Sequence, residues 1–348
     1  MSARALALWC CLVLASPAAI AASASAPAGL QRNVVFAAYS PLAGSAELMR
    51  RLMSPLEAMR LQRQLVQQHQ ALREQSIDLR RERFVIYVPT RAPPANGFAL
   101  LVFVPPWKQA VVPQDWIPAL DGSGTIFVSA NDSGNDADVL DRREPLALLA
   151  AYNIMRRYRI DPQRVYVGGF SGGSKVALRL ALAYPDLFRG ALLEAGSEPI
   201  GSTEIPLPPA DLFHAFQQSA RLVFLTGERD DYHRREDAHS RDSLKQWCMF
   251  NIDTVTMPRI GHELADRSGF IQALHKLAEP ASPDGDKLTP CRAAIAQAKD
   301  AQLRQAQSLL AVGKPDQARK LLEQIDARYG GLATPGSIQL MEQIDAQR

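Results

Sequence analysis

Ser171 lies in a setting that favours nucleophilic catalysis in this 348-residue chain. It occupies the centre of the run GFSGG at 169–173, a G-x-S-x-G pattern between an apolar segment and an amphipathic one. A serine at such a strand-to-helix turn presents its hydroxyl above the sheet edge, and the flanking glycines let the turn close without a clash. The following helix directs backbone N–H groups, that of Gly172 first, at a developing oxyanion. The pattern predicts that Ser171 is a nucleophile and that Gly172 helps form an oxyanion hole.

Two further side chains would complete this chemistry. A serine hydroxyl needs a base to take its proton and a carboxylate to orient that base. In an open α/β sheet with this kind of turn, the acid and then the histidine follow the serine along the chain. Asp230 follows the apolar run 221–226 and is the predicted acid, with Asp231 as the alternative. His262 follows the last predicted strand and is the predicted base, because the other five histidines lie in predicted helices or too close to the acid strand.

Other interpretations of these loops fit less well. A phosphate-binding loop ends in Gly-Lys-Ser/Thr, whereas here Ser174 precedes Lys175. A structural glycine turn with an incidental serine remains an alternative to the nucleophile. The acidic loop 131–138 lacks the alternating ligands and terminal Glu of an EF-hand, so we interpret it as a rim loop of the site. We expect no cofactor and no metal.

Strands and helices must alternate to position these residues. Apolar runs and amphipathic segments alternate beyond residue 82, which predicts a mostly parallel sheet with helices on both faces. Ligands of such α/β proteins bind at the carboxyl ends of the strands. The predicted strands are 84–89, 98–104, 125–130, 164–168, 190–195, 221–226 and 251–257. The predicted helices are 144–158, 172–184, 211–220, 232–250 and 269–278.

The first 24 residues resemble an export signal. Arg4 precedes an apolar stretch that ends in small residues, with A-x-A frames closing at Ala24 and at Ala26. Cleavage after Ala24 is preferred, because a cut after Ala26 would place Pro27 next to the scissile bond. The apolar stretch is short for a bilayer span, so we expect an exported, periplasmic or secreted protein with no membrane segment in its mature form. Cys248 and Cys291 would be the cysteines left after cleavage. A disulfide between them can persist in an oxidising compartment, and the sequence does not decide whether they are bridged.

The remaining chain divides into a body and two appendages. Residues 25–81 are predicted to be a helical segment, 82–280 the α/β domain and 281–289 a linker. Residues 290–348 have a helical pattern in which LLEQIDA recurs as LMEQIDA, and they resemble a tetratricopeptide-like hairpin. One such repeat cannot bury its apolar face alone, so we expect it to dock on the body or on a protein partner. The sequence leaves open whether it binds or only braces.

Composition excludes several classes of protein. The 47% hydrophobic and 22% charged residues are typical of a globular chain rather than a disordered or fibrous one. The formal net charge is +3, from 39 basic and 36 acidic residues without a long like-charge block. We therefore expect no nucleic acid partner.

The chain resembles the α/β-hydrolase superfamily, nearest to its exported polyhydroxybutyrate-depolymerase-like and feruloyl-type esterases. The resemblance covers about residues 82–280 and rests on RVYVGGFSGGSKVAL, TGERD and the GHE turn. It implies a serine nucleophile, an orienting aspartate and a histidine that acts first as base and then as acid. The expected substrate is a small or polymeric carboxylic ester. The same triad also serves amides, so a serine peptidase is one alternative.

One segment departs from the family pattern. The family usually has His-Gly after the strand that supplies the second oxyanion donor, whereas this chain has Pro105-Pro106-Trp107. Proline has no N–H, so the backbone N–H of Trp107 is the expected second donor. A further alternative is therefore a decayed hydrolase that binds a partner through its C-terminal helices. Phe170 and Trp116 are expected to form walls of the substrate site, although core packing explains them as well.

Overall fold

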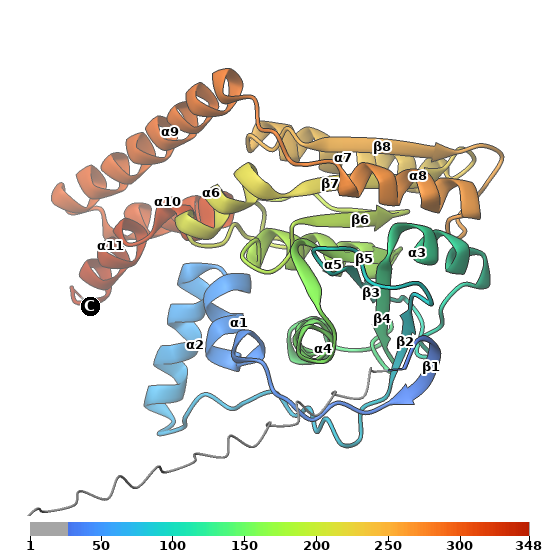
Figure 1. Cartoon of the computed structure of the whole chain (residues 1–348). Coiled ribbons are helices and arrows are strands. Elements are labelled where there is room, and N and C mark those ends of the chain that lie inside the picture. The colour runs from blue at the N-terminus through green and yellow to red at the C-terminus, as the bar shows by residue number, and fades with distance from the viewer. Residues whose placement is uncertain (1–26, 348) are drawn as a thin grey trace, which may run out of the picture.

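A computed structural model describes residues 27–347, and the predicted signal peptide at 1–24 lies outside the described residues. The body is built on one eight-stranded sheet in the order β1-β2-β4-β3-β5-β6-β7-β8 (Figure 1). Strand β2 runs antiparallel to β1 and β4, and all other neighbours are parallel. The predicted α/β-hydrolase fold is confirmed. The strands are β1 (Gly29–Val34), β2 (Phe84–Val88), β3 (Phe98–Val104), β4 (Thr125–Ala130), β5 (Ile160–Phe170), β6 (Gly190–Glu194), β7 (Arg221–Gly227) and β8 (Ile252–Met257).

The central strands are apolar on both faces because helices cover both sides. Along β3, Leu100 and Val102 enter the larger core, whereas Leu101 and Phe103 enter the smaller one, as the period of two in a strand requires. Helices α4 and α5 pack in the larger core, and α3 and α8 pack in the smaller one. The helices are α1 (Ser45–Leu52), α2 (Pro55–Gln67), α3 (Ile117–Ser123), α4 (Glu144–Arg157), α5 (Gly172–Ala183), α6 (Ala210–Ser219), α7 (Asp231–Gln246), α8 (Arg267–Ala278), α9 (Gly285–Ala311), α10 (Pro315–Tyr329) and α11 (Gly336–Asp345), with short helical turns η1 (Pro41–Ala43), η2 (Gln114–Trp116), η3 (Val139–Arg143) and η4 (Gly330–Ala333).

The appendages differ from the sequence expectation in two places. The N-terminal segment is not only helical, because β1 pairs with β2 at the sheet edge. Helix α9 begins at Gly285, inside the predicted linker 281–289. The reason is the cap: the Asp284 carboxylate accepts hydrogen bonds from the backbone N–H groups of Asp286 and Lys287. Pro290 within the helix concealed this start from the sequence pattern.

The C-terminal helices contact helix α2 of the N-terminal segment through the two copies of the repeated motif (Figure 1). In the first copy, the Asp326 carboxylate accepts hydrogen bonds from the Ser54 hydroxyl at 2.5 Å and from the Leu56 N–H at 3.1 Å, at the start of α2. In the second copy, Asp345 pairs with Arg63 on the same helix. Both copies therefore hold the C-terminal segment against α2.

A covalent bond adds to this docking. Cys248, which follows α7, is bonded to Cys291 in α9, with a Cα–Cα distance of 5.9 Å. The sequence had left this pairing undecided. Among residues 27–347, no helix has the length and apolar character that a bilayer crossing requires.

Candidate active site

Ser171 occupies the sharp turn between β5 and α5. Its φ of 53° and ψ of −124° are strained for a residue with a side chain, at a cost of roughly 1–3 kcal/mol. The Ser171 N–H donates to the carbonyl of Glu194 at 2.8 Å, which helps hold the turn. A Cβ at Gly169 would lie 2.2 Å from the Gly173 carbonyl oxygen, and a Cβ at Gly173 would lie 1.9 Å from the Val104 carbonyl oxygen. Both flanking glycines are therefore required by close backbone approach.

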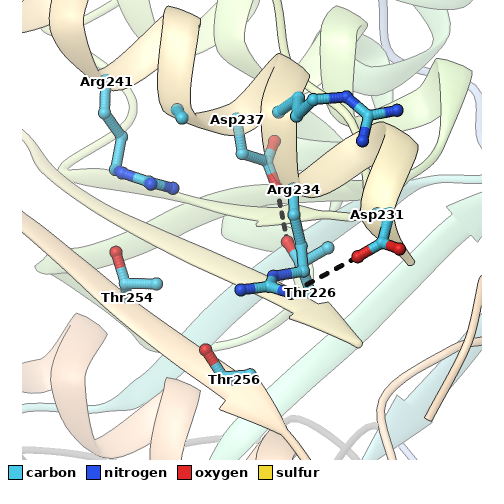
Figure 2. A pocket seen from close by; sticks show the side chains of 9 residues that line it. Thr226, Asp231, Arg234, Asp237, Arg241, Thr254 and Thr256 are labelled. Atoms are coloured by element: carbon cyan, nitrogen blue, oxygen red, sulfur yellow. Dashed lines mark hydrogen bonds and ion pairs between the residues drawn. The ribbon is translucent and has the colours of Figure 1, made fainter. Parts of the chain in front are cut away.

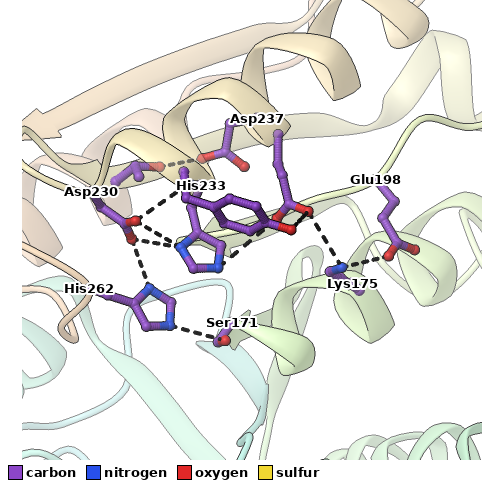
Figure 3. Close-up of polar contacts among 10 residues, drawn as sticks. Ser171, Lys175, Glu198, Asp230, His233, Asp237 and His262 are labelled. Atoms are coloured by element: carbon purple, nitrogen blue, oxygen red, sulfur yellow. Dashed lines mark hydrogen bonds and ion pairs between the residues drawn. The ribbon is translucent and has the colours of Figure 1, made fainter.

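The three residues singled out in the sequence meet above the sheet edge (Figure 3). The Ser171 hydroxyl lies 3.1 Å from His262 Nε2, and His262 Nδ1 lies 2.7 Å from Asp230 Oδ2. The Asp230 side chain is 6% exposed and that of His262 is 38% exposed. With Nδ1–H donating to the carboxylate, Nε2 is free to accept the serine proton. This arrangement can activate a hydroxyl nucleophile.

Asp230, not its neighbour Asp231, faces the histidine. Asp230 is the N-cap of α7, so its carboxylate points back over the first turn. Asp231 is 76% exposed and pairs with Arg234. Burial alone would raise the pKa of Asp230, but hydrogen bonds from His233 and His262 outweigh it and hold that pKa below its ordinary value. The carboxylate therefore remains ionised at neutral pH.

The two expected oxyanion donors lie on segments that meet at the start of α5. The segment after β3 packs on the first turn of α5, and the loop 131–138 supports it from outside. A Cβ at Gly134 would lie 2.7 Å from the carbonyl carbon of Trp107, and the Asn135 N–H donates to the Pro106 carbonyl at 2.9 Å. The Asn135 side chain lies against Gly172, where a Cβ would come within 2.2 Å of its Oδ1. The loop thus contacts both donor segments, as a rim loop would.

The two aromatic candidates occupy different places. The Phe170 ring lies 4.7 Å from that of His262 and 6.0 Å from that of Trp107, measured between centroids. Trp116 is fully buried, stacks on Phe270 at 3.9 Å and donates its indole N–H to the Ala265 carbonyl. The interpretation of Trp116 as a wall of the substrate site therefore needs correction, because no part of its side chain reaches the surface.

Two residues that the sequence did not single out also belong here. His233 lies in the first turn of α7, and its Nδ1 is 2.8 and 2.9 Å from the two oxygens of Asp230. Glu194 ends β6, is fully buried, and accepts a hydrogen bond from the Ala265 N–H at 3.2 Å. Burial raises the pKa of Glu194 to about 8, so this side chain is protonated at neutral pH. The sequence argues against His233 as the base because it lies close to the acid strand. The same closeness brings its ring to Asp230.

A metal ion would compete with hydrogen bonds that already exist. The ligand atoms of Asp230, His233 and His262 lie within 4.8 Å of one another. Both imidazoles, however, use Nδ1 to contact the same carboxylate. The cluster is explained by these hydrogen bonds without an ion.

Two cavities flank this region. One, of about 460 Å³, lies beside Gly172 and is lined by the charged side chains Arg143, Lys175 and Arg179 together with apolar Leu140. Lys175 is paired with Glu198 at 2.6 Å (Figure 3). A second cavity, of about 360 Å³, lies between α7 and strands β7 and β8 (Figure 2). None of Ser171, Asp230 and His262 lines either cavity, and the first reaches the site only through Gly172. The residues of the second cavity are Thr226, Asp231, Arg234, Arg235, Asp237, Ala238, Arg241, Thr254 and Thr256.

A short stretch of the chain is similar to a known protein. No family model matches the sequence. The chain is 44% identical over 54 residues to "Putative esterase NocK" of Nocardia uniformis subsp. tsuyamanensis, a match that covers 16% of this chain and 14% of that protein. The chain thus spans about a seventh of the length of this relative.

Several solved structures resemble part of the chain. A dipeptidyl peptidase 4 of Porphyromonas gingivalis matches with a TM-score of 0.41 and 15% identity, over 56% of this chain and 33% of that one. A ferulic acid esterase matches with a TM-score of 0.40 and 14% identity, over 56% of this chain and 92% of that one. The fold is established by the sheet order itself.

Proposed function

We propose that this protein is an exported serine hydrolase that cleaves carboxylic esters. The observation that carries the proposal is the pair of contacts made by His262, 3.1 Å to Ser171 Oγ and 2.7 Å to Asp230 Oδ2. An imidazole held in this way accepts a proton at one nitrogen while the carboxylate stabilises the charge that develops on the ring. The strained turn of Ser171 and the two donor segments around Gly172 support the same reaction.

In the first half of the reaction the enzyme becomes acylated. Ser171 Oγ attacks the ester carbonyl carbon as His262 Nε2 takes its proton, and the carbonyl electron pair moves onto oxygen. The backbone N–H groups of Gly172 and Trp107 stabilise this oxyanion, and one such donor is typically worth about 10²–10³ in rate. The carbonyl re-forms, the bond to the alcohol oxygen breaks, and His262 gives its proton to the leaving alcohol.

In the second half water replaces the alcohol. His262 Nε2 takes a proton from a water molecule, which attacks the acyl carbon of the acyl-enzyme. The second tetrahedral species collapses when the bond to Ser171 Oγ breaks, and His262 returns the proton to that oxygen. The products are the free acid and the regenerated enzyme. The cavity of about 460 Å³ beside Gly172 gives room for part of the substrate.

Covalent labelling and a substrate panel test the proposal. The mature chain should react with a fluorophosphonate probe and hydrolyse p-nitrophenyl esters, and Ser171→Ala should abolish labelling and reduce ester turnover by about 10⁴-fold or more. The matched control is Ser268→Ala at an exposed position on α8, which should behave as wild type. Ester turnover that survives in Ser171→Ala would refute the proposal. A probe-inert wild type would indicate a decayed hydrolase, and cleavage of peptide p-nitroanilides together with no cleavage of unactivated alkyl esters would indicate a peptidase.

Export is the second part of the proposal. The disulfide between Cys248 and Cys291 supports it, because such bonds persist in oxidising compartments and are rare in the cytosol. Expression of the full chain followed by N-terminal sequencing of the exported product should give a start after Ala24. An intact N-terminus on a cytosolic product would refute export and leave the hydrolase proposal standing.

A further inference from the structure

A second histidine is built into the carboxylate side of the site. His233 Nδ1 lies 2.8 Å from Oδ1 and 2.9 Å from Oδ2 of Asp230, while His262 Nδ1 lies 2.7 Å from Oδ2 (Figure 3). One carboxylate therefore holds two imidazoles. The carboxylate also caps α7 by accepting the His233 backbone N–H at 3.4 Å. The ring N–H shared by both oxygens adds to this cap and fixes the plane in which Oδ2 faces His262.

The same ring also bounds the position of the predicted base. The centroids of the His233 and His262 rings are 4.0 Å apart, and the ring planes differ by 12°. Phe170 lies near the same imidazole at 4.7 Å, with a plane that differs by 28°. His262 is thus stacked against two rings, and its outer nitrogen can approach Ser171 with little freedom to tilt.

The surroundings of His233 are shaped for an aromatic ring. Gly196, with φ of +116°, lies beside it, and a Cβ there would come within 2.7 Å of the His233 Cδ2. The other ring nitrogen faces the Glu236 carboxylate at 4.0 Å, and Glu236 also accepts a hydrogen bond from the Tyr232 hydroxyl. The His233 side chain is 18% exposed. Its ring is therefore set in place from several elements.

We propose that His233 is a positioning residue of this site, which fixes the Asp230 carboxylate and stacks against His262 so that Nε2 is aimed at Ser171. This inference rests on the proposed serine hydrolase function. The lowered pKa of Asp230, to which the His233 hydrogen bond contributes, is consistent with it. His233 acts through the carboxylate and the neighbouring imidazole, and it has no hydrogen bond to Ser171 among the contacts of the described residues.

Two substitutions separate the hydrogen bond from the ring. His233→Phe keeps a stacked ring and removes the N–H, so kcat for a p-nitrophenyl ester should fall about 10–100-fold, the usual effect of losing a charge-assisted supporting bond. KM should be unchanged, because the side chain lies behind the predicted base. His233→Asn places an amide N–H near the former Nδ1 and should recover kcat to within about fivefold of wild type, a rescue that a merely structural role would not give.

Further measurements keep the test decisive. His239→Phe, at an exposed position on the same helix, is the matched control and should leave kcat unchanged. Should His233→Phe fail to fold, His233→Ala with added imidazole takes its place, and imidazole should restore the rate. Any of three results would overturn the inference. The first is a kcat within twofold of wild type in folded His233→Phe, and the second is a His233→Asn variant as slow as His233→Phe. The third is a His233→Ala variant whose rate imidazole does not restore. None of these outcomes affects the proposed function, which fails only in the Ser171→Ala and labelling experiments.

Discussion

Glu194 should make the stability of this protein fall as the pH rises toward 8. The side chain is fully buried at the end of β6, where burial raises its pKa from an ordinary 4.5 to about 8. Between these values the unfolded chain has lost the proton and the native chain retains it, so unfolding releases a proton and the free energy of unfolding decreases with pH. The stabilising protonated state is fully present below about pH 4.5, and its contribution is lost progressively up to about pH 8.

The magnitude follows from the same two values. The interval from 4.5 to about 8 at about 1.4 kcal/mol per pH unit corresponds to about 5 kcal/mol at most. Glu194→Gln keeps the shape of the side chain and an oxygen that can accept from the Ala265 N–H, but it cannot ionise. The variant should therefore gain stability relative to wild type as the pH rises, with the gain levelling off above about pH 8.

Guanidinium chloride unfolding of both proteins from about pH 5 to about pH 9 measures this difference. Other titrating groups are common to both chains and cancel in the comparison. Glu342→Gln, at an exposed position on α11, is the matched control and should show no trend with pH. A difference between Glu194→Gln and wild type that stays constant from about pH 5 to about pH 8 would mean that Glu194 is ionised in the native protein, and the burial argument would be wrong.

Two other changes test how the C-terminal helices are held. Replacing Cys248 and Cys291 by alanine opens a loop with a sequence separation of 43 and should lower the free energy of unfolding by up to about 4 kcal/mol, measured by chemical denaturation without reductant; an unchanged midpoint would contradict this. Asp326→Ala leaves the Leu56 N–H and the Ser54 hydroxyl without their acceptor and should cost about 1–3 kcal/mol in the same assay, whereas a loss below about 0.5 kcal/mol would show that this contact does not hold the segment.

The sequence predicted best the features that follow from a short motif or from the general geometry of a parallel sheet. The turn at Ser171 could be found because glycines at fixed spacing are needed for a close backbone approach that involves neighbouring residues. The positions of Asp230 and His262 could be predicted because parallel strands bring their carboxyl ends to one edge. The choice between Asp230 and Asp231 could not be made in the same way, because it depends on which of them caps α7.

Features that depend on distant packing were not predictable. Trp116 and Phe170 are both aromatic, and only packing places one in the core and the other beside His262. The pairing of β1 at the sheet edge has no strong apolar alternation to signal it. His233 follows Asp230 by three residues, a spacing that joins them within one helical turn. That spacing became informative once the helix was known to begin at Asp231.

The disulfide between Cys248 and Cys291 restrains the edge of the sheet at β8, which lies opposite the edge at β1. The covalent ring that it closes contains β8, the turn that carries His262, and α8. Strand β8 is the last in the sheet and has one neighbour, so fewer contacts oppose its local opening than oppose that of a central strand. Here such an opening is limited by a tether at each end of the segment. The disulfide thus limits how far the His262 imidazole can move from the Ser171 hydroxyl when β8 opens locally.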